Sequence, residues 1–291
     1  MNSPTAQNRP RVVVVTGASS GIGRETALRF ARDHACVVIA ARSEGPLREV
    51  AQECREAGAA DVVFQSTDIG DADEVQRLFD LAVQTYGRVD VAVQSAANTA
   101  FGRFEDLPAD VFEVIIRTNL LGSANVARSA LALFRASGSG HLVLVGSLLG
   151  TVAVPNQSAY VASKFAINGL VRALRQENRD LPGVRVHGIY PGPVDTPVYG
   201  TADNYLEQTP KVPPSSVSGA TIATAIVRAT GRRRSSERQV GWFNRPAIAG
   251  YRFLPALFDA LIEPFLKVTA YTSEPSEPKP DKPYSVADRH G

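Results

Sequence analysis

The feature that most constrains this fold is a series of short apolar runs, each the length of one β-strand, that alternate with longer stretches of helical periodicity. The first run, RVVVVT at residues 11–16, is apolar at every position between its ends rather than at alternate positions. Continuous apolarity of this kind predicts a strand that is buried on both faces, as in a parallel sheet covered by helices. Further strands are expected at residues 36–41, 61–66, 89–94, 141–147 and 184–190, with a short last strand at about 239–243.

The stretches between these runs have the spacing of helices. Expected helices span residues 22–33, 46–57, 72–86, 108–136, 157–180 and about 215–230. Pro46 and Pro108 lie near two of the expected starts, where a missing backbone N–H costs little. Repeated β–α units connect through right-handed crossovers. The sequence therefore predicts an α/β fold: a doubly wound, mostly parallel Rossmann sheet of about seven strands, with helices on both faces.

The sequence predicts one main domain and three shorter parts, one before it and two after it. We expect a flexible N-terminus at residues 1–10, followed by a Rossmann domain at 11–245. Within this domain, residues 193–214 are rich in Pro, Gly and Thr and are expected to form a substrate loop. The tail at 272–291 is rich in Pro, Glu, Lys and Ser and is expected to be disordered, because it cannot bury enough apolar surface.

An apolar extension at residues 246–271 precedes this tail. Its large apolar residues recur at helical spacing, and Pro255 and Pro264 are expected to divide it into short helices. With arginines nearby, one interpretation is a peripheral helix pair on an anionic membrane surface. Packing on the protein's own pocket or on a neighbouring subunit is favoured, because Asp259 and Glu263 would face the anionic lipid.

Composition argues against several classes of partner. The net charge of +2 is too balanced to indicate nucleic acid binding. No stretch approaches the roughly 20 uncharged apolar residues that a spanning helix needs, and the first ten residues lack a signal-like apolar core. A cytoplasmic location is expected. The only cysteines, Cys36 and Cys54, form no metal-ligand spacing, so no metal site is predicted.

A glycine-rich turn follows the first expected strand directly. Glycines let the backbone approach a pyrophosphate, and the N-terminus of the next helix offers unpaired N–H groups to it. A turn of this type between a buried strand and an amphipathic helix indicates a dinucleotide site. The residues expected to contact the dinucleotide here are Gly17, Ser19, Ser20, Gly21, Ile22 and Gly23.

The end of the second strand predicts which dinucleotide binds. An acidic residue there would accept the ribose 2′-OH of NAD, whereas an arginine accommodates a 2′-phosphate. The sequence carries Arg42 and no carboxylate at this strand end, so NADP(H) is favoured over NAD. After the third strand, Asp68 and Ile69 stand where a carboxylate could meet the adenine amino group.

Three further residues have the pattern of a proton-transfer site. Tyr160 and Lys164 are four residues apart on one expected helix, so their side chains share a face. An ammonium near a phenol favours the phenolate and moves its pKa from about 10 toward working pH. Ser147 lies at the carboxyl end of the fifth expected strand, at the edge where ligands bind, and its hydroxyl could bond a carbonyl oxygen that Tyr160 protonates.

Taken together, these motifs closely resemble the short-chain dehydrogenase/reductase superfamily. TGASSGIG is similar to its TGxxxGIG motif, YVASK to YxxSK, and the segment 188–197 to its PGxVxT region. The resemblance implies that Asn119 is a fourth catalytic residue that holds a water, and that Lys164 binds the nicotinamide ribose. It further implies that Gly192, Val194 and Thr196 flank the nicotinamide, with Val194 and Thr196 holding the carboxamide. Assembly into a homodimer or homotetramer through the helices at 108–136 and 157–180 is also expected.

One motif departs from the family pattern. The family's NNAG after the fourth strand is replaced by Gln94-Ser95-Ala96-Ala97. Ser95, Ala96 and Ala97 are still expected at the cofactor. The family asparagine braces the sheet, so either Gln94 or Ser95 must replace its hydrogen bond, or that bond is lost.

These residues predict an NADP(H)-dependent oxidoreductase that interconverts a carbonyl and an alcohol, with Tyr160 as the acid or base. A catalytically silent NADP(H)-binding sensor or scaffold is the alternative, although such a protein would be expected to lose Tyr160 or Lys164. An epimerase or dehydratase is disfavoured by the glycine spacing and the short C-terminal part. The residues expected to face the substrate carry no charged anchor, so a lipophilic small molecule is favoured; they are Ser147, Leu148, Leu149, Val152, Val154, Tyr160, Val194 and Tyr199.

Overall fold

The central sheet is wholly parallel, as the continuous apolar runs predict. The computed structural model describes residues 9–275 and contains a seven-stranded sheet in the order β12-β7-β6-β4-β1-β2-β3. Its strands are β1 (Val12–Thr16), β2 (Cys36–Ala41), β3 (Asp61–Ser66), β4 (Val91–Gln94), β6 (Gly140–Val145), β7 (Val184–Pro191) and β12 (Ser236–Val240). Because every neighbouring pair is parallel, all carboxyl ends meet at one edge.

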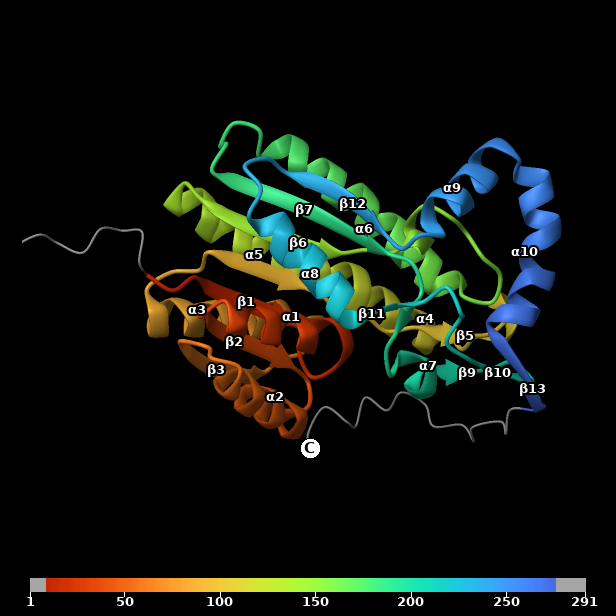
Figure 1. Cartoon of the computed structure of the whole chain (residues 1–291), viewed down its shortest axis with the longest axis horizontal. Helices are drawn as coiled ribbons and strands as arrows, with labels where there is room; N and C mark the ends of the chain where they lie inside the picture. The colour runs from red at the N-terminus through yellow and green to blue at the C-terminus, as the bar shows by residue number, and fades with distance from the viewer. Residues whose placement is uncertain (1–8, 276–291) are drawn as a thin grey trace, which may run out of the picture.

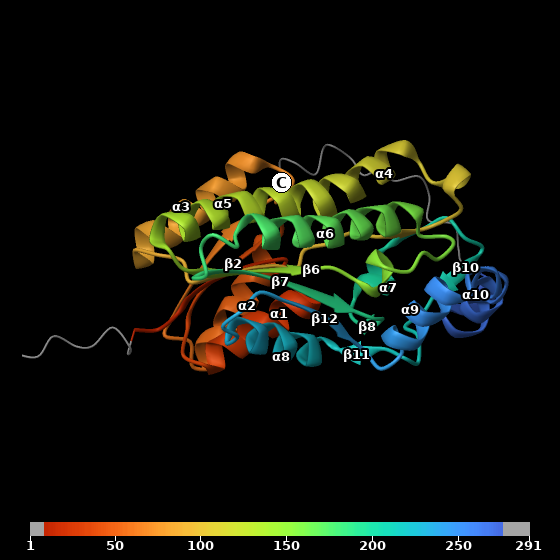
Figure 2. The same cartoon turned by 90° about the horizontal axis from the view of Figure 1, so that it is seen from above.

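Helices cover both faces of this sheet (Figures 1 and 2). One layer consists of α1 (Gly21–Arg32), α2 (Glu44–Glu56) and α8 (Gly219–Thr230). The other consists of α3 (Ala72–Tyr86), α4 (Ala109–Ile116), α5 (Gly122–Ser137) and α6 (Ser158–Glu177). Successive strand side chains point to opposite faces, so Val13 and Val15 pack in one core and Val14 in the other. The predicted α/β doubly wound fold is confirmed.

Two predicted elements differ from the structure. The last strand was expected at 239–243 but spans Ser236–Val240, where it pairs with β7. Its polar start is held by tertiary contacts: the Ser236 hydroxyl lies 2.9 Å from a ring nitrogen of His187, and Glu237 accepts from Tyr190. The helix expected at 108–136 is α4 and α5 joined by a π-helical turn, Arg117–Leu121.

Short elements gather at the carboxyl edge and beyond the last strand. They are β5 (Ala100–Phe101), β8 (Val194–Asp195), α7 (Val198–Thr201), β9 (Asp203–Asn204), β10 (Gln208–Pro210), β11 (Val217–Ser218), α9 (Asn244–Phe253), α10 (Pro255–Thr269) and β13 (Tyr271–Pro275). None of the described helices has the length and apolarity needed to cross a membrane. In Figures 1 and 2, α9 and α10 stand beyond the carboxyl edge of the sheet.

The C-terminal extension is more regular than its sequence indicates. Pro255 begins α10, as predicted, but Pro264 lies inside the same helix rather than ending it. A proline at this position leaves the carbonyl of Ala260 without its helical N–H, and both residues are exposed, so water can bind that carbonyl. Predicted disorder also began too early, because residues 271–275 form β13, which pairs with β10. The remainder of the predicted tail, 276–291, and most of the predicted flexible N-terminus lie outside the described residues.

Asn244 connects the sheet to this extension. It is fully buried, and its amide donates to the carbonyl oxygen of Tyr190 at 3.1 Å and to Oε1 of Gln239 at 2.9 Å. These bonds join the ends of β7 and β12 to the first residue of α9. The side chain thereby fixes where the extension leaves the sheet.

We expect Asn244→Ala to lower the free energy of unfolding by about 2 kcal/mol, because it leaves buried acceptors unpaired. Urea unfolding, with Arg245→Ala at the exposed neighbouring position as the control, measures this. A change no larger than that of the control variant would show that Asn244 does not fix this junction.

Candidate active site

A cavity of about 850 Å³ opens along the carboxyl edge of the sheet. At one end it is bounded by the glycine turn after β1, and at the other by α9 and α10. Every residue predicted to contact the cofactor lines this cavity, as do Ser147, Leu149 and Tyr199, which were predicted to contact substrate. Leu148, Val152 and Val154 line it as well.

The glycine turn packs tightly against the backbone around it. Gly17 has a φ of 73°, and a Cβ there would lie 2.4 Å from the backbone nitrogen of Ala96. A Cβ at Gly23 would lie 2.1 Å from the carbonyl oxygen of Gly17. The side chain of Ser20, at the N-cap of α1, makes no capping hydrogen bond, and the first turn of α1 carries no acidic residue. Free N–H groups and the positive end of the helix dipole therefore face the cavity, which fits a dinucleotide pyrophosphate.

Arg42 lies at the cavity beyond the end of β2. Its side chain is exposed and has no hydrogen-bond or ion-pair partner within residues 9–275. Ser43 lines the cavity beside it. An unpaired guanidinium and a hydroxyl at this point fit an additional phosphate on the adenosine ribose.

Asp68 lines the same end, with Ile69 next to it. One carboxylate oxygen of Asp68 accepts from the N–H of Gly70 at 2.8 Å, which fixes the side chain in a local turn. The other oxygen is available to a ligand such as the adenine amino group. The position of Asp68 is therefore compatible with the adenine contact that the sequence indicated.

At residues 94–97, where the family's NNAG is replaced, Ser95 makes a hydrogen bond between two strands. Its hydroxyl donates to the carbonyl oxygen of Thr16 at 2.7 Å, so the end of β4 stays bonded to the end of β1. Gln94 is buried and bonds locally, with Nε2 donating to the carbonyl oxygen of Ala96 at 2.9 Å. Of the two alternatives left open by the sequence, Ser95 supplies the brace between strands.

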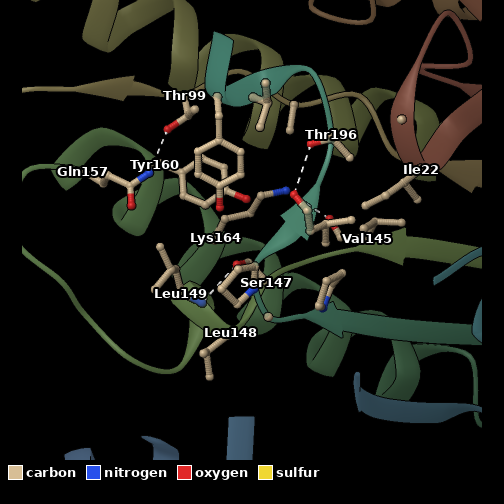
Figure 3. A pocket seen from close by; sticks show the side chains of 18 of the residues that line it. Ile22, Thr99, Val145, Ser147, Leu148, Leu149, Gln157, Tyr160, Lys164 and Thr196 are labelled. Atoms are coloured by element: carbon tan, nitrogen blue, oxygen red, sulfur yellow. Dashed lines mark hydrogen bonds between the residues drawn. The ribbon is translucent and has the colours of Figure 1, made fainter. Parts of the chain in front are cut away.

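Ser147, Tyr160 and Lys164 point into one part of the cavity (Figure 3). Ser147 lies two residues after the end of β6, and its Oγ accepts from the N–H of Leu149 at 3.0 Å. With that lone pair occupied, the hydroxyl proton can be donated to a ligand oxygen. Tyr160 and Lys164 come from the first turns of α6, four residues apart as the sequence indicated.

Burial shifts the proton affinities of both α6 residues. Lys164 is only 2% exposed, and its Nζ donates to the carbonyl oxygen of Val145 at 3.1 Å. Burial lowers the pKa of Lys164 to about 8. Burial also raises the pKa of Tyr160, and a hydrogen bond with Ser147 opposes that rise. The Lys164 ammonium nitrogen lies 5.4 Å from the centre of the Tyr160 ring, where its charge favours the phenolate.

Asn119 lies behind the cavity rather than in its lining. It is buried in the π-helical turn; its Nδ2 donates to Ser163 Oγ and to the carbonyl oxygen of Asn98, both at 2.9 Å. Its Oδ1 accepts from the N–H of Asn98 at 2.7 Å. Its backbone carbonyl accepts from the Ser123 hydroxyl. These hydrogen bonds place Asn119 against α6 and the loop after β4.

Sequence reasoning missed several polar residues of the cavity. Gln157 donates to the Thr99 hydroxyl at 3.3 Å, and both side chains line the cavity beside Tyr160 (Figure 3). Asn98 and Thr118 also line it. Their nearness in sequence to recognised motifs was the only available signal: Gln157 precedes YVASK, and Asn98 and Thr99 follow the QSAA segment.

Comparisons with known proteins agree with this geometry. Residues 11–205 match the family model described as short chain dehydrogenase. The chain is 32% identical to the uncharacterized oxidoreductase YxnA of Bacillus subtilis over 279 residues, which cover 93% of this chain and 76% of that protein. It is 33% identical to a sepiapterin reductase of Chlorobaculum tepidum over 225 residues, covering 75% of this chain and 89% of that protein.

Solved structures of oxidoreductases are also similar to this chain. An alcohol dehydrogenase from the archaeon Thermococcus sibiricus, complexed with 5-hydroxy-NADP, has a TM-score of 0.70 at 29% identity and covers 80% of this chain and 97% of its own. An actinorhodin polyketide ketoreductase with NADPH has a TM-score of 0.72 at 26% identity, with coverages of 79% and 95%. The parallel sheet, the glycine turn and the match over most of the chain show that this protein belongs to the short-chain dehydrogenase family of nicotinamide-dependent oxidoreductases.

Proposed function

We propose that this protein is an NADP(H)-dependent oxidoreductase that interconverts a carbonyl and an alcohol on a small lipophilic substrate. The observation that carries the proposal is the convergence of Ser147, Tyr160 and Lys164 in the cavity that the glycine turn bounds. A silent cofactor-binding sensor would have no need of a phenol, a hydroxyl and a buried ammonium at one point.

Each side chain has one task in the proposed reaction. Ser147 donates its hydroxyl proton to the substrate oxygen and so fixes the position of the reacting carbon. Tyr160 gives a proton to that oxygen during reduction and removes it during oxidation. Lys164 lowers the proton affinity of Tyr160 by its charge and would bind the nicotinamide ribose. The bound nicotinamide supplies or accepts the hydride.

Asn119 would complete a proton path from Lys164 to solvent, as the family resemblance implies. Its own contacts support a positioning role, because it bonds Asn98 at the cavity wall and Ser163 on α6. Ser163 in turn donates to the carbonyl oxygen of Tyr160 at 2.7 Å. A shift of Asn119 would therefore be transmitted to the first turn of α6.

The unpaired Arg42 supports NADP(H) over NAD. Ser43 adds a hydroxyl at the same place, and Pro46 lines the cavity behind it. The two similar solved structures described above carry NADPH or a derivative of NADP. Val194 and Thr196 line the cavity where the proposal places the nicotinamide carboxamide.

Assembly into a dimer or tetramer is part of the proposal. Leu121, at the start of the α5 region, and Phe165 on α6 are large apolar side chains that remain exposed. They lie on the pair of helices expected to form subunit contacts, and burial in a two-fold interface would remove both from water.

Replacing the proton donor should abolish catalysis while sparing the fold. We expect Tyr160→Phe to lower kcat at least about 100-fold, because only the hydroxyl is removed. Tyr199→Phe, in the same cavity, is expected to retain kcat within about tenfold. Steady-state kinetics with NADPH binding measured in parallel test this, and a Tyr160→Phe enzyme of nearly normal turnover would exclude the assignment.

Reversing the charge at Arg42 should change the cofactor preference. We expect Arg42→Asp to weaken NADPH binding by at least about tenfold relative to NADH, through a lost phosphate contact and a new repulsion. Arg48→Asp, exposed on α2 outside the cavity lining, controls for a general charge effect. Titration calorimetry provides the affinities. Equal affinity of the unaltered protein for the two cofactors would contradict the proposal.

The buried ammonium should reduce stability below pH 8. Between pH 8 and 10.5 the unfolded chain keeps a proton that folded Lys164 has released, so the free energy of unfolding rises with pH in this window. Below pH 8 the destabilisation of the folded state by the buried ammonium reaches its full value of about 3 kcal/mol. We therefore expect Lys164→Met to be more stable than the unaltered apoprotein at neutral pH, with a smaller advantage midway between pH 8 and 10.5.

Urea unfolding at these two pH values measures the difference. Lys267→Met, on the exposed surface of α10, is the matched control and should show no such pH dependence. A Lys164→Met variant of unchanged or lower stability at neutral pH would show that the ammonium is adequately solvated in the folded protein.

A further inference from the structure

Helix α10 forms an arch over one end of the active-site cavity and is held at both of its ends. At its start, Phe258 packs with Leu148, Val152 and the α9 residue Ala247. At its end, Leu266 and the following residues pack in a second cluster with Phe101, Tyr199 and Ala202. The pairing of β13 with β10 adds backbone bonds there. The arch lies outside the part of the chain that matches the family model.

The middle of the arch has apolar side chains that belong to neither cluster. Leu257, Leu261 and Ile262 all line the cavity, yet Leu257 remains 53% exposed and Leu261 55% exposed. In Figure 1, α10 stands apart from the sheet, and within its second half Phe265 stacks on Phe243, with ring centroids 5.6 Å apart. Exposed apolar side chains that line a cavity are the typical lining of a lipophilic ligand site.

The charged residues of the cavity lining lie toward its cofactor end and its centre. Arg42 and Asp68 lie at the cofactor end and Lys164 at the centre, and these are its only charged lining residues within the described chain. From Tyr160 to α10 the lining is apolar, apart from uncharged groups such as Thr99, Gln157 and Thr269. An anionic or cationic substituent placed under the arch would lose its hydration without an opposite charge to replace it.

From these features we infer that the space under α10 holds the apolar body of the substrate, an extended alkyl chain or fused ring system without charge. This inference rests on the proposed function, because it places the reacting carbonyl or secondary alcohol at Tyr160 and Ser147. The apolar body then runs from that point along Leu257, Leu261 and Ile262. Burying both surfaces removes apolar area of substrate and arch from water.

Two other occupants fit the arch less well. An anionic membrane would meet Asp259 and Glu263 on α10, and Glu263 is already paired with Lys267. A second copy of the chain would have to enter a space that is continuous with Ser147 and Tyr160. A substrate is the occupant for which that continuity is required.

The test is a series of straight-chain methyl ketones of increasing length, reduced with NADPH. We expect kcat/KM to rise about threefold for each added methylene in the unaltered protein, until the space is filled. The double variant Leu257→Ser, Leu261→Ser should lose at least about tenfold for long ketones and little for short ones. Val268→Ser is the matched control, because Val268 is an apolar α10 residue that is 76% exposed and does not line the cavity.

Failure of this inference is distinguishable from failure of the proposed function. Reduction of short ketones with no dependence on chain length, or equal losses in the double variant and in Val268→Ser, would overturn the inference alone. If no ketone is reduced, the binding of a long-chain ketone to the NADPH-bound protein is measured by calorimetry. Affinity that is weakened by the double variant but not by Val268→Ser supports the site. Absence of binding overturns the inference. Dissociation of an oligomer by the double variant, seen by light scattering, would assign the arch to a subunit interface instead.

Discussion

The whole molecule depends on a sheet whose strands all run in one direction and are buried on both faces. Such a sheet carries helices on each side, so the only open places on the strands are their ends. Residues that leave β1, β4, β6 and β7 are thereby brought to one edge, although the chain separates them widely. At this edge Gly17 lies so close to Ala96 that a Cβ would clash with it, and the Ser95 hydroxyl donates to Thr16. The position of the cofactor turn is thus set by backbone packing between two strands.

The fold was predictable because its main signal is local. Most strands of the sheet are runs of apolar residues, and β2 and β3 have the bounds that their runs predict. The errors occur where distant contacts override local pattern. Polar Ser236 and Glu237 do not resemble a buried strand, but His187 and Tyr190 bond them. The π-helical turn could not be predicted either, since Asn119 is held there by Asn98 and Ser163, partners far away in the sequence.

The two ends of the cavity differ in how well the sequence predicts their lining residues. Around the glycine turn and Tyr160, function requires particular residue types at fixed spacing, so the motifs identified the lining residues. The α10 lining requires only apolar side chains at helical spacing, a pattern shared by any amphipathic helix. Sequence could indicate that the extension had an apolar face but not what the face covers. The number of residues between α9 and β13, and the pairing of β13 with β10, decide that it spans the cavity.

The attachment of α10 at both ends also restricts how the active site can open. A helix fixed at one end moves as a hinged flap, and a large ligand then enters along the path that the flap clears. A helix fixed at both ends can only bow, roll about its axis or lose one attachment, and losing the second one breaks the β10–β13 ladder. A ligand too wide to pass beside α10 would therefore leave only after the β10–β13 pairing has opened. The dissociation rate of such a ligand would then depend on its width as well as on its affinity.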